Sequence, residues 1–147
     1  MISTKVYDEN NKPSSSVKND IVNFLAMHLE KYGDPKYQIH KALDYSVKDH
    51  ASFGGFTLTM VQDDAIVGSA VINKTGMGGY IPENILFYIA THVDHRGKGI
   101  GKQLMQQVIK NCDGDIASHV EKNNPAIHLY ERLGFTNPYL EMRLKRQ

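Results

Sequence analysis

The stretch that decides the fold runs from residue 85 to residue 101 and is ILFYIATHVDHRGKGIG. Its first part, residues 85–91, is a nearly continuous apolar run, which is typical of a central strand buried on both faces. Its second part, residues 96–101, is a turn rich in glycine. Apolar residues at helical spacing follow, up to about residue 112. The segment therefore predicts a strand, a glycine turn and a helix in direct succession.

This arrangement has the chemistry of an anion site. Glycines let backbone N–H groups approach an anion closely, and the start of the next helix adds free N–H groups and a positive dipole end. Arg96, Lys98 and Lys102 place cationic charge nearby. The turn therefore predicts a pyrophosphate site, and the alternative is a connection that holds no ligand. A dinucleotide-binding G-x-G-x-x-G turn is excluded because its last glycine would fall on Lys102.

Strands and helices alternate along the rest of the chain. Residue periodicity predicts strands at about 2–7, 56–61, 65–72, 85–91, 116–120 and 139–144, and helices at about 17–29, 36–49, 100–112 and 126–133. The predicted order is β-α-α-β-β-β-α-β-α-β, which is a mixed α/β sheet. With 147 residues, the chain has the length of a single domain.

Composition narrows the classes of function. The net charge is +1, so no overall field favours nucleic acid or an anionic membrane, and we expect neither as a partner. No apolar run reaches the roughly 20 residues that span a bilayer, and no apolar segment of a signal peptide follows Met1. The single cysteine, Cys112, has no partner in the chain. These features favour a cytoplasmic protein.

Two segments together resemble the GNAT superfamily of N-acetyltransferases. Arg-x-x-Gly-x-Gly at positions 96–101 resembles the acetyl-CoA signature of that superfamily, and the segment from Asn123 to Phe135, NNPAIHLYERLGF, resembles its second hallmark. Both segments stand in the expected order, with a predicted helix and strand between them. The resemblance covers roughly residues 85–135 and implies the GNAT-like acyl-CoA N-acyltransferase fold.

The resemblance implies acetyl-CoA as the cosubstrate and assigns it a binding surface. The end of the central strand would pair with the pantetheine arm at a bulge that splays this strand from the next. The glycine turn would take the pyrophosphate. The matching positions are Ile89, Ala90, Thr91, Arg96, Gly97, Lys98, Gly99, Ile100, Gly101, Lys102 and Asn123.

Catalytic roles follow from the same resemblance. Tyr130 matches a tyrosine that protonates the leaving thiolate. Glu83 lies 13 residues before Arg96, which is the spacing of the catalytic base in the histone-acetyltransferase branch. Many small-molecule branches place a glutamate four residues later, where this chain has Phe87. His92 or water remains an alternative proton acceptor, and Glu83 as a solvated strand residue is the alternative to catalysis.

We therefore expect an N-acetyltransferase that moves an acetyl group from acetyl-CoA directly to a primary amine. Two alternatives are an acyl-CoA-binding sensor of the same fold without catalysis and an unrelated phosphoanion-binding protein. The acceptor, a small molecule or a peptide, cannot be deduced from the sequence. Dimers are common among such enzymes, so a homodimer is one expected assembly. His92 and His95 lack the ligand spacing of a helical metal site, and no metal is expected.

Overall fold

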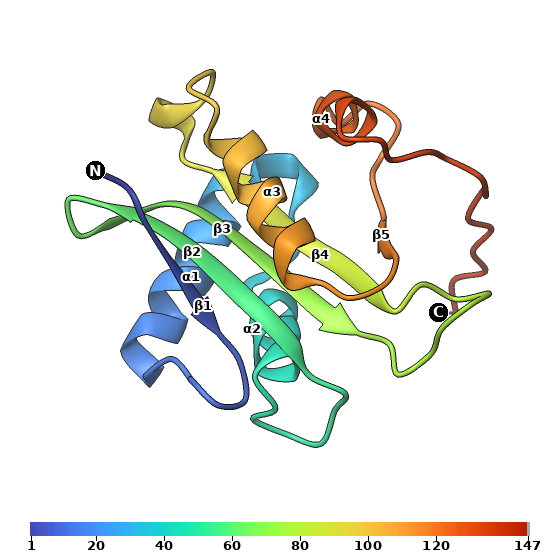
Figure 1. Cartoon of the computed structure of the whole chain (residues 1–147), viewed down its shortest axis with the longest axis horizontal. Coiled ribbons are helices and arrows are strands. Elements are labelled where there is room, and N and C mark those ends of the chain that lie inside the picture. Colours follow the sequence, from blue (N-terminus) through green and yellow to red (C-terminus); the bar gives the residue numbers. More distant parts are fainter. Residues whose placement is uncertain (147) are drawn as a thin grey trace.

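The computed structural model describes residues 1–146 and contains one sheet of five strands in the order β1-β2-β3-β4-β5 (Figure 1). Neighbouring strands from β1 to β4 are antiparallel, whereas β5 runs parallel to β4. The strands are β1 Ser3–Tyr7, β2 Gly55–Gln62, β3 Ala65–Lys74, β4 Asn84–Thr91 and β5 Ile116–Ser118.

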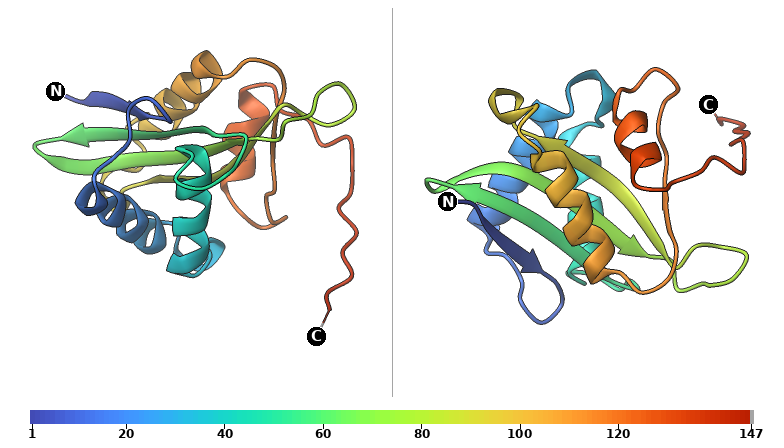
Figure 2. Two further views of the ribbon diagram at one scale, coloured as in Figure 1. Left: turned by 90° about the horizontal axis from the view of Figure 1, so that it is seen from below. Right: turned by 45° about the horizontal axis from the view of Figure 1, so that its top comes forward.

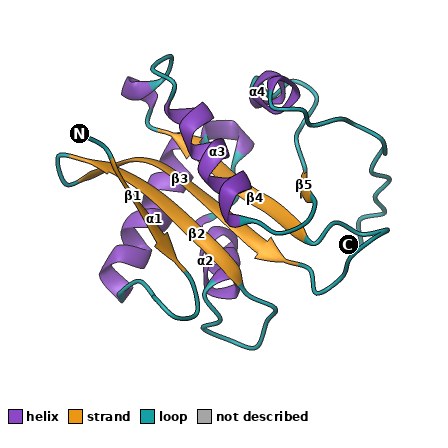
Figure 3. Cartoon of the chain, in the orientation of Figure 1, coloured by secondary structure: helices purple, strands orange, loops and turns teal. Residues whose placement is uncertain are grey.

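Helices cover both faces of the sheet. Figure 2 shows α1 and α2 on one face and α3 on the other, and Figure 3 shows α4 beside the end of the sheet that carries β5. The helices are α1 Ser15–His28, α2 Lys36–Ser46, α3 Ile100–Asn111 and α4 Ala126–Arg132, with short 3-10 turns η1 Glu30–Tyr32 and η2 Val93–His95. No helix in the described part of the chain has the length and apolar character that a bilayer crossing requires.

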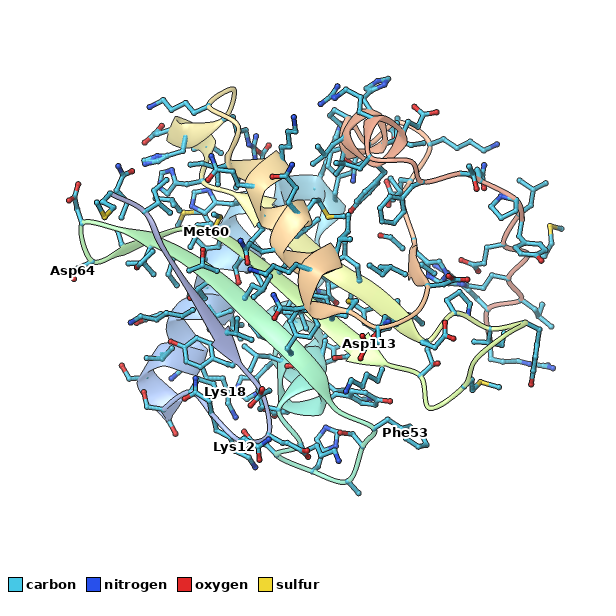
Figure 4. The ribbon with its side chains drawn as sticks, in the orientation of Figure 1. Lys12, Lys18, Phe53, Met60, Asp64 and Asp113 are labelled. Carbon is cyan, nitrogen blue, oxygen red and sulfur yellow. The ribbon has the colours of Figure 1, made fainter. Side chains whose placement is uncertain are left out.

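Local chemistry explains where the elements begin and turn. The Ser14 hydroxyl accepts a hydrogen bond from the Val17 amide at 3.2 Å and caps α1. Asp63 and Asp64 both have positive φ, as a two-residue hairpin turn between β2 and β3 requires. Lys12, before α1, and Lys18, within it, are labelled in Figure 4. Both form ion pairs with Asp49, which fastens this part of the chain to the turn that follows α2.

Two hydrophobic clusters fill the space between the sheet and its helices. One cluster joins α3 to the sheet and includes the fully buried Leu104 and Val108. The other joins α1 and α2 to the opposite face and includes the fully buried Leu25 and Leu43. At about 25 cal/mol per Å² of buried apolar surface, these clusters supply the main driving force for folding.

The predicted order of elements is confirmed up to α4, and the last strand is wrong. Residues 139–144 form no strand, and Tyr139 and Met142 are almost fully exposed. The alternation of apolar side chains in this segment is real, but a strand also needs a neighbouring edge, and the segment runs apart from the sheet (Figure 1). The second helix also ends earlier than predicted, at Ser46, because Lys48 adopts a positive φ.

Candidate active site

The central strand β4 has one closed edge and one open edge. Along β3 it is paired from Asn84 to Thr91, whereas along β5 the pairing stops at Leu86, opposite Ser118. After Ser118, the segment that follows β5 turns away from β4 and runs toward α4 (Figure 1). Within residues 1–146, the outer main-chain edge of Ile89, Ala90 and Thr91 therefore has no strand partner. Such an edge can pair with an extended ligand.

β4 has a bulge next to the residue at which its pairing with β5 ends. The register between β3 and β4 shifts between the pairs Val71–Tyr88 and Ile72–Leu86, so that Phe87 has no partner on β3. Phe87 is 44% exposed, and the prediction of a strand buried on both faces is wrong at this residue. The bulge also lies two residues nearer the start of the strand than the expected position at residues 89–91.

The glycine turn has the backbone conformation that glycine favours. Gly97 and Gly99 have φ values of 79° and 80°, a region that costs other residues roughly 1–2 kcal/mol. A Cβ atom built at either position would meet no atom within 4 Å. The glycines are therefore needed for the turn itself, and the space in front of them is open.

The helix α3 begins with an exposed, uncapped N-terminus. Gly99 precedes its first residue, Ile100, and no side chain accepts a hydrogen bond from the first amides. Lys98 and Lys102 are both exposed beside this end. Free N–H groups, the positive end of the helix dipole and two ammonium groups together match the needs of a pyrophosphate.

Arg96 has a different immediate role from the one its charge predicts. Its Nη1 donates to Glu30 Oε1 and its Nη2 donates to the main-chain oxygen of His28, both at 2.8 Å. The side chain thus fixes the start of the glycine turn to the end of α1 and to η1. Its charge is shared with a carboxylate, so the backbone of the turn and the two lysines are the groups free to meet an anion.

Gly101 brings the open edge, the turn and α4 together. A Cβ atom at this position would lie 3.5 Å from Leu129 Cδ2 and 3.6 Å from Thr91 Oγ1. The first turn of α3 therefore packs between the end of β4 and the helix that carries Tyr130. The end of β4, the glycine turn and α4 therefore lie next to one another, which places the predicted cofactor-binding residues beside the helix that carries Tyr130.

The model of the acetyltransferase (GNAT) domain family matches residues 54–137, more than half of the chain. The protein belongs to the GNAT acetyltransferase family. No curated protein matches significantly. This GNAT domain is similar over 100% of both chains to a GNAT family acetyltransferase from Streptococcus pneumoniae, with 16% identity and a TM-score of 0.71.

Two further solved structures have the same fold. The ribosomal-protein-S18-alanine N-acetyltransferase from Escherichia coli has 16% identity and a TM-score of 0.71 over 95% of this chain and 80% of that chain. An aminoglycoside N-acetyltransferase, AAC(6')-Iy in complex with CoA, has 15% identity and a TM-score of 0.66 over 100% and 95%. At such identities the likeness shows the fold alone.

Within this GNAT domain, Tyr130 is buried and lies on the inner side of α4. It is 6% exposed, belongs to the cluster that joins α3 to the sheet, and has its ring centroid 5.3 Å from that of Phe135. Burial raises the pKa of Tyr130, and the nearby side chain of Ser118 partly offsets this. The hydroxyl therefore keeps its proton at neutral pH, as a general acid must.

Glu83, the predicted base, ties two loops together. Its Oε1 accepts a hydrogen bond from the Asp115 amide at 2.9 Å, and its side chain packs against Gly78 and Gly114. The Asp115 amide, its own amide and that of Gly79 hold the pKa of Glu83 below its usual range. A carboxylate stabilised in this way is a weaker base. Its catalytic role stays a prediction.

Three histidines gather between α1 and the end of β4. The ring centroids of His28 and His92 lie 4.2 Å apart, and those of His92 and His95 lie 5.3 Å apart. His28 is 5% exposed, and its Nδ1 accepts a hydrogen bond from the Val93 amide at 3.3 Å. Burial, followed by His92 and Arg96, lowers the pKa of His28. Among residues 1–146, no group of three His, Cys, Asp or Glu side chains is arranged to hold a metal ion.

Asn123 lies at the entrance to α4 and is exposed. Its main-chain oxygen accepts a hydrogen bond from the Tyr32 hydroxyl at 3.1 Å, which links η1 to this loop. The side chain of the next residue, Asn124, accepts a hydrogen bond from the Ala126 amide at 2.9 Å, at the start of the helix. The Asn-Asn-Pro segment therefore holds α4 in place beside the site.

Sequence reasoning missed a cavity of about 340 Å³ on the face of the sheet that carries α2. Gln38, Lys41 and Tyr45 line it from α2, and Phe87 and Tyr88 line it from β4. The helical spacing of the first three residues was visible in the sequence. The contribution of Phe87 and Tyr88 could not be predicted. It depends on a bulge that turns two consecutive side chains toward the cavity, and a bulge within an apolar run has no recognisable sequence pattern.

Proposed function

We propose that this GNAT protein transfers an acetyl group from acetyl-CoA directly to a primary amine. The observation that supports this most is the junction at Gly101, where the open edge of β4, the uncapped start of α3 and the helix of Tyr130 meet. The open space before Gly97 and Gly99 suits a pyrophosphate, and the unpaired edge of Ile89, Ala90 and Thr91 suits the amides of a pantetheine arm. The residues present therefore fit acetyl-CoA.

When bound, acetyl-CoA supplies a thioester whose C–S bond breaks as the amine nitrogen forms a new C–N bond. The amine must first lose a proton, because an alkyl ammonium with a pKa near ~10.4 is almost wholly protonated at pH 7. Tyr130 holds a proton at a buried hydroxyl and can give it to the departing sulfur. The products are an N-acetyl amide and a free thiol.

The pH dependence of activity in the Glu83→Gln variant can show whether Glu83 accepts the proton of the amine. If Glu83 is the base, the variant loses activity at neutral pH and regains it as the pH rises toward 10, since free amine then becomes abundant. If Glu83 only orders the loops, the variant has a lower melting temperature and an unchanged pH profile. The same pH profile measured for His92→Gln tests His92, the alternative proton acceptor.

The proposal itself is tested by two measurements. Calorimetric titration should show binding of acetyl-CoA that free CoA displaces and ATP does not. A thiol-release assay with a panel of primary amines should then show turnover. Binding without turnover for any amine would favour the sensor alternative, and no binding would reject the proposal. The cytoplasmic location and the homodimer stay predictions.

A further inference from the structure

The cavity is lined by residues of α2, β3 and β4. α2 lies on the opposite face of the sheet from α3 (Figure 2). The floor of the cavity comes from β4 and its wall from α2. At about 340 Å³, it is near the lower end of the range for small-molecule sites. A ligand in this cavity would contact β4 from the face of the sheet that carries α2, whereas the predicted pyrophosphate site lies at the start of α3, on the other face.

The bulge connects this cavity to the reaction site. Phe87 and Tyr88 are consecutive, yet both line the cavity, because the register shift turns two neighbouring side chains toward the same face. The bulge sits immediately after Leu86, where β5 stops pairing with β4. A molecule in the cavity therefore lies next to the start of the open edge.

The charged groups at the cavity all have one sign. Lys41 on α2 and Lys74 at the end of β3 line it, and no aspartate or glutamate does. Among the described residues, neither lysine takes part in an ion pair. The carboxylate nearest along α2, Asp44, is instead bound by Lys18 at 2.7 Å. The two ammonium groups repel a polycation and attract an anion.

We propose that this cavity is the acceptor site and that it takes a small primary amine carrying an anionic group, not a polyamine or an aminoglycoside. This inference rests on the proposed function. The apolar side chains of Ile85 and Phe87 line the cavity and can contact the body of such a molecule, while Lys41 and Lys74 bind its carboxylate or phosphate. The amine nitrogen then faces the bulge, where it becomes acetylated and gives up one proton.

The test uses three matched series of amines with two to five carbons. All share a primary amine at one end, and they carry a carboxylate, a carboxamide or a second ammonium group at the other. We expect kcat/KM, corrected for the fraction of free amine, to be about five- to tenfold higher for the carboxylates than for the carboxamides, since both lysines are exposed. The diamines should be the poorest acceptors.

Variants then assign the preference to the cavity. The double variant Lys41→Gln, Lys74→Gln should lose the preference for carboxylate-bearing amines. The double variant Lys41→Glu, Lys74→Glu should instead prefer diamines. Lys110→Gln, on the exposed side of α3, removes one positive charge elsewhere and should leave the preference unchanged. A preference for diamines in the unmodified protein, or a carboxylate preference that survives both changes, would overturn the inference.

A binding measurement separates this inference from the proposed function. The backbone amide resonances of Tyr45 and Phe87 are followed by NMR while the same three series are added. If no amine is acetylated, the proposed function fails, and the titration still decides the question of the cavity. Shifts caused by carboxylates alone support an anion-selective site, whereas equal shifts with all three series, or none, reject it.

Discussion

The two edges of β4 differ in their partner strands, because β3 is antiparallel to it and long, whereas β5 is parallel to it and short. The edge facing β3 is paired from Asn84 to Thr91 except at the bulge residue Phe87, and its hydrogen bonds hold the sheet together. The edge facing β5 is paired only from Asn84 to Leu86, and within residues 1–146 the rest of this edge has no strand partner. One edge stabilises the fold, while the other leaves backbone groups for a ligand. Substitutions on either side of this division can test it, and the strongest consequence is expected at the glycine turn.

Blocking the glycine turn should have the largest effect. Gly99→Glu places a side chain and a negative charge where a pyrophosphate would sit, and we expect the Kd for acetyl-CoA to rise by more than about 10²-fold. Calorimetric titration measures this. Gly79→Glu is a matched control, because Gly79 also has a positive φ, 74°, and open space around it. Unchanged binding by folded Gly99→Glu would remove the turn from the site.

Removing the Tyr130 hydroxyl should leave binding intact and slow the chemistry. Tyr130→Phe keeps the buried ring, so we expect kcat to fall by about 10²-fold with little change in acetyl-CoA affinity. Single-turnover rates with the best amine provide the measurement. Tyr7→Phe, on β1, serves as the control. An equal single-turnover rate in the variant would reduce Tyr130 to a packing residue.

The contact between the end of α1 and the residues that follow β4 should respond to pH through His28. Burial lowers its pKa, so the unfolded chain binds a proton more readily than the folded chain does. Below the ordinary pKa near ~6.5, unfolding takes up a proton, and stability falls as the pH falls. We expect a lower melting temperature at pH 5 than at pH 7, and a weaker dependence on pH in His28→Gln. Identical profiles for the two proteins would contradict this explanation.

Removing the end of the chain from Tyr139 onward should have the smallest effect on stability. Tyr139, Leu140, Met142 and Leu144 are mostly exposed, so their deletion removes little buried surface. We expect the free energy of unfolding to change by less than about 0.5 kcal/mol. Urea titration of the shortened and full chains gives the comparison. A much larger loss would show that this segment has a partner that stabilises it.

Local sequence rules were enough to predict the order of elements up to α4 and the glycine turn, whereas the pyrophosphate site assigned to that turn stays a prediction. These features depend on local rules: apolar periodicity sets strands and helices, and the positive φ of Gly97 and Gly99 follows from a turn that other residues adopt at a cost. The prediction that Tyr130 is catalytic likewise depends on a motif within one short segment. Each of these signals involves residues close together in the chain.

Which side chains already have a hydrogen-bond or ion-pair partner became visible only in the folded protein. Arg96 is bound to Glu30, 66 positions away, and Glu83 is held by the amide of Asp115, 32 positions away. The bulge at Phe87, the cavity beside α2 and the unpaired end of the chain depend on how separate strands align. Pairing register and ion pairing are properties of segments distant in sequence, so the local pattern that forms each element cannot reveal its partners.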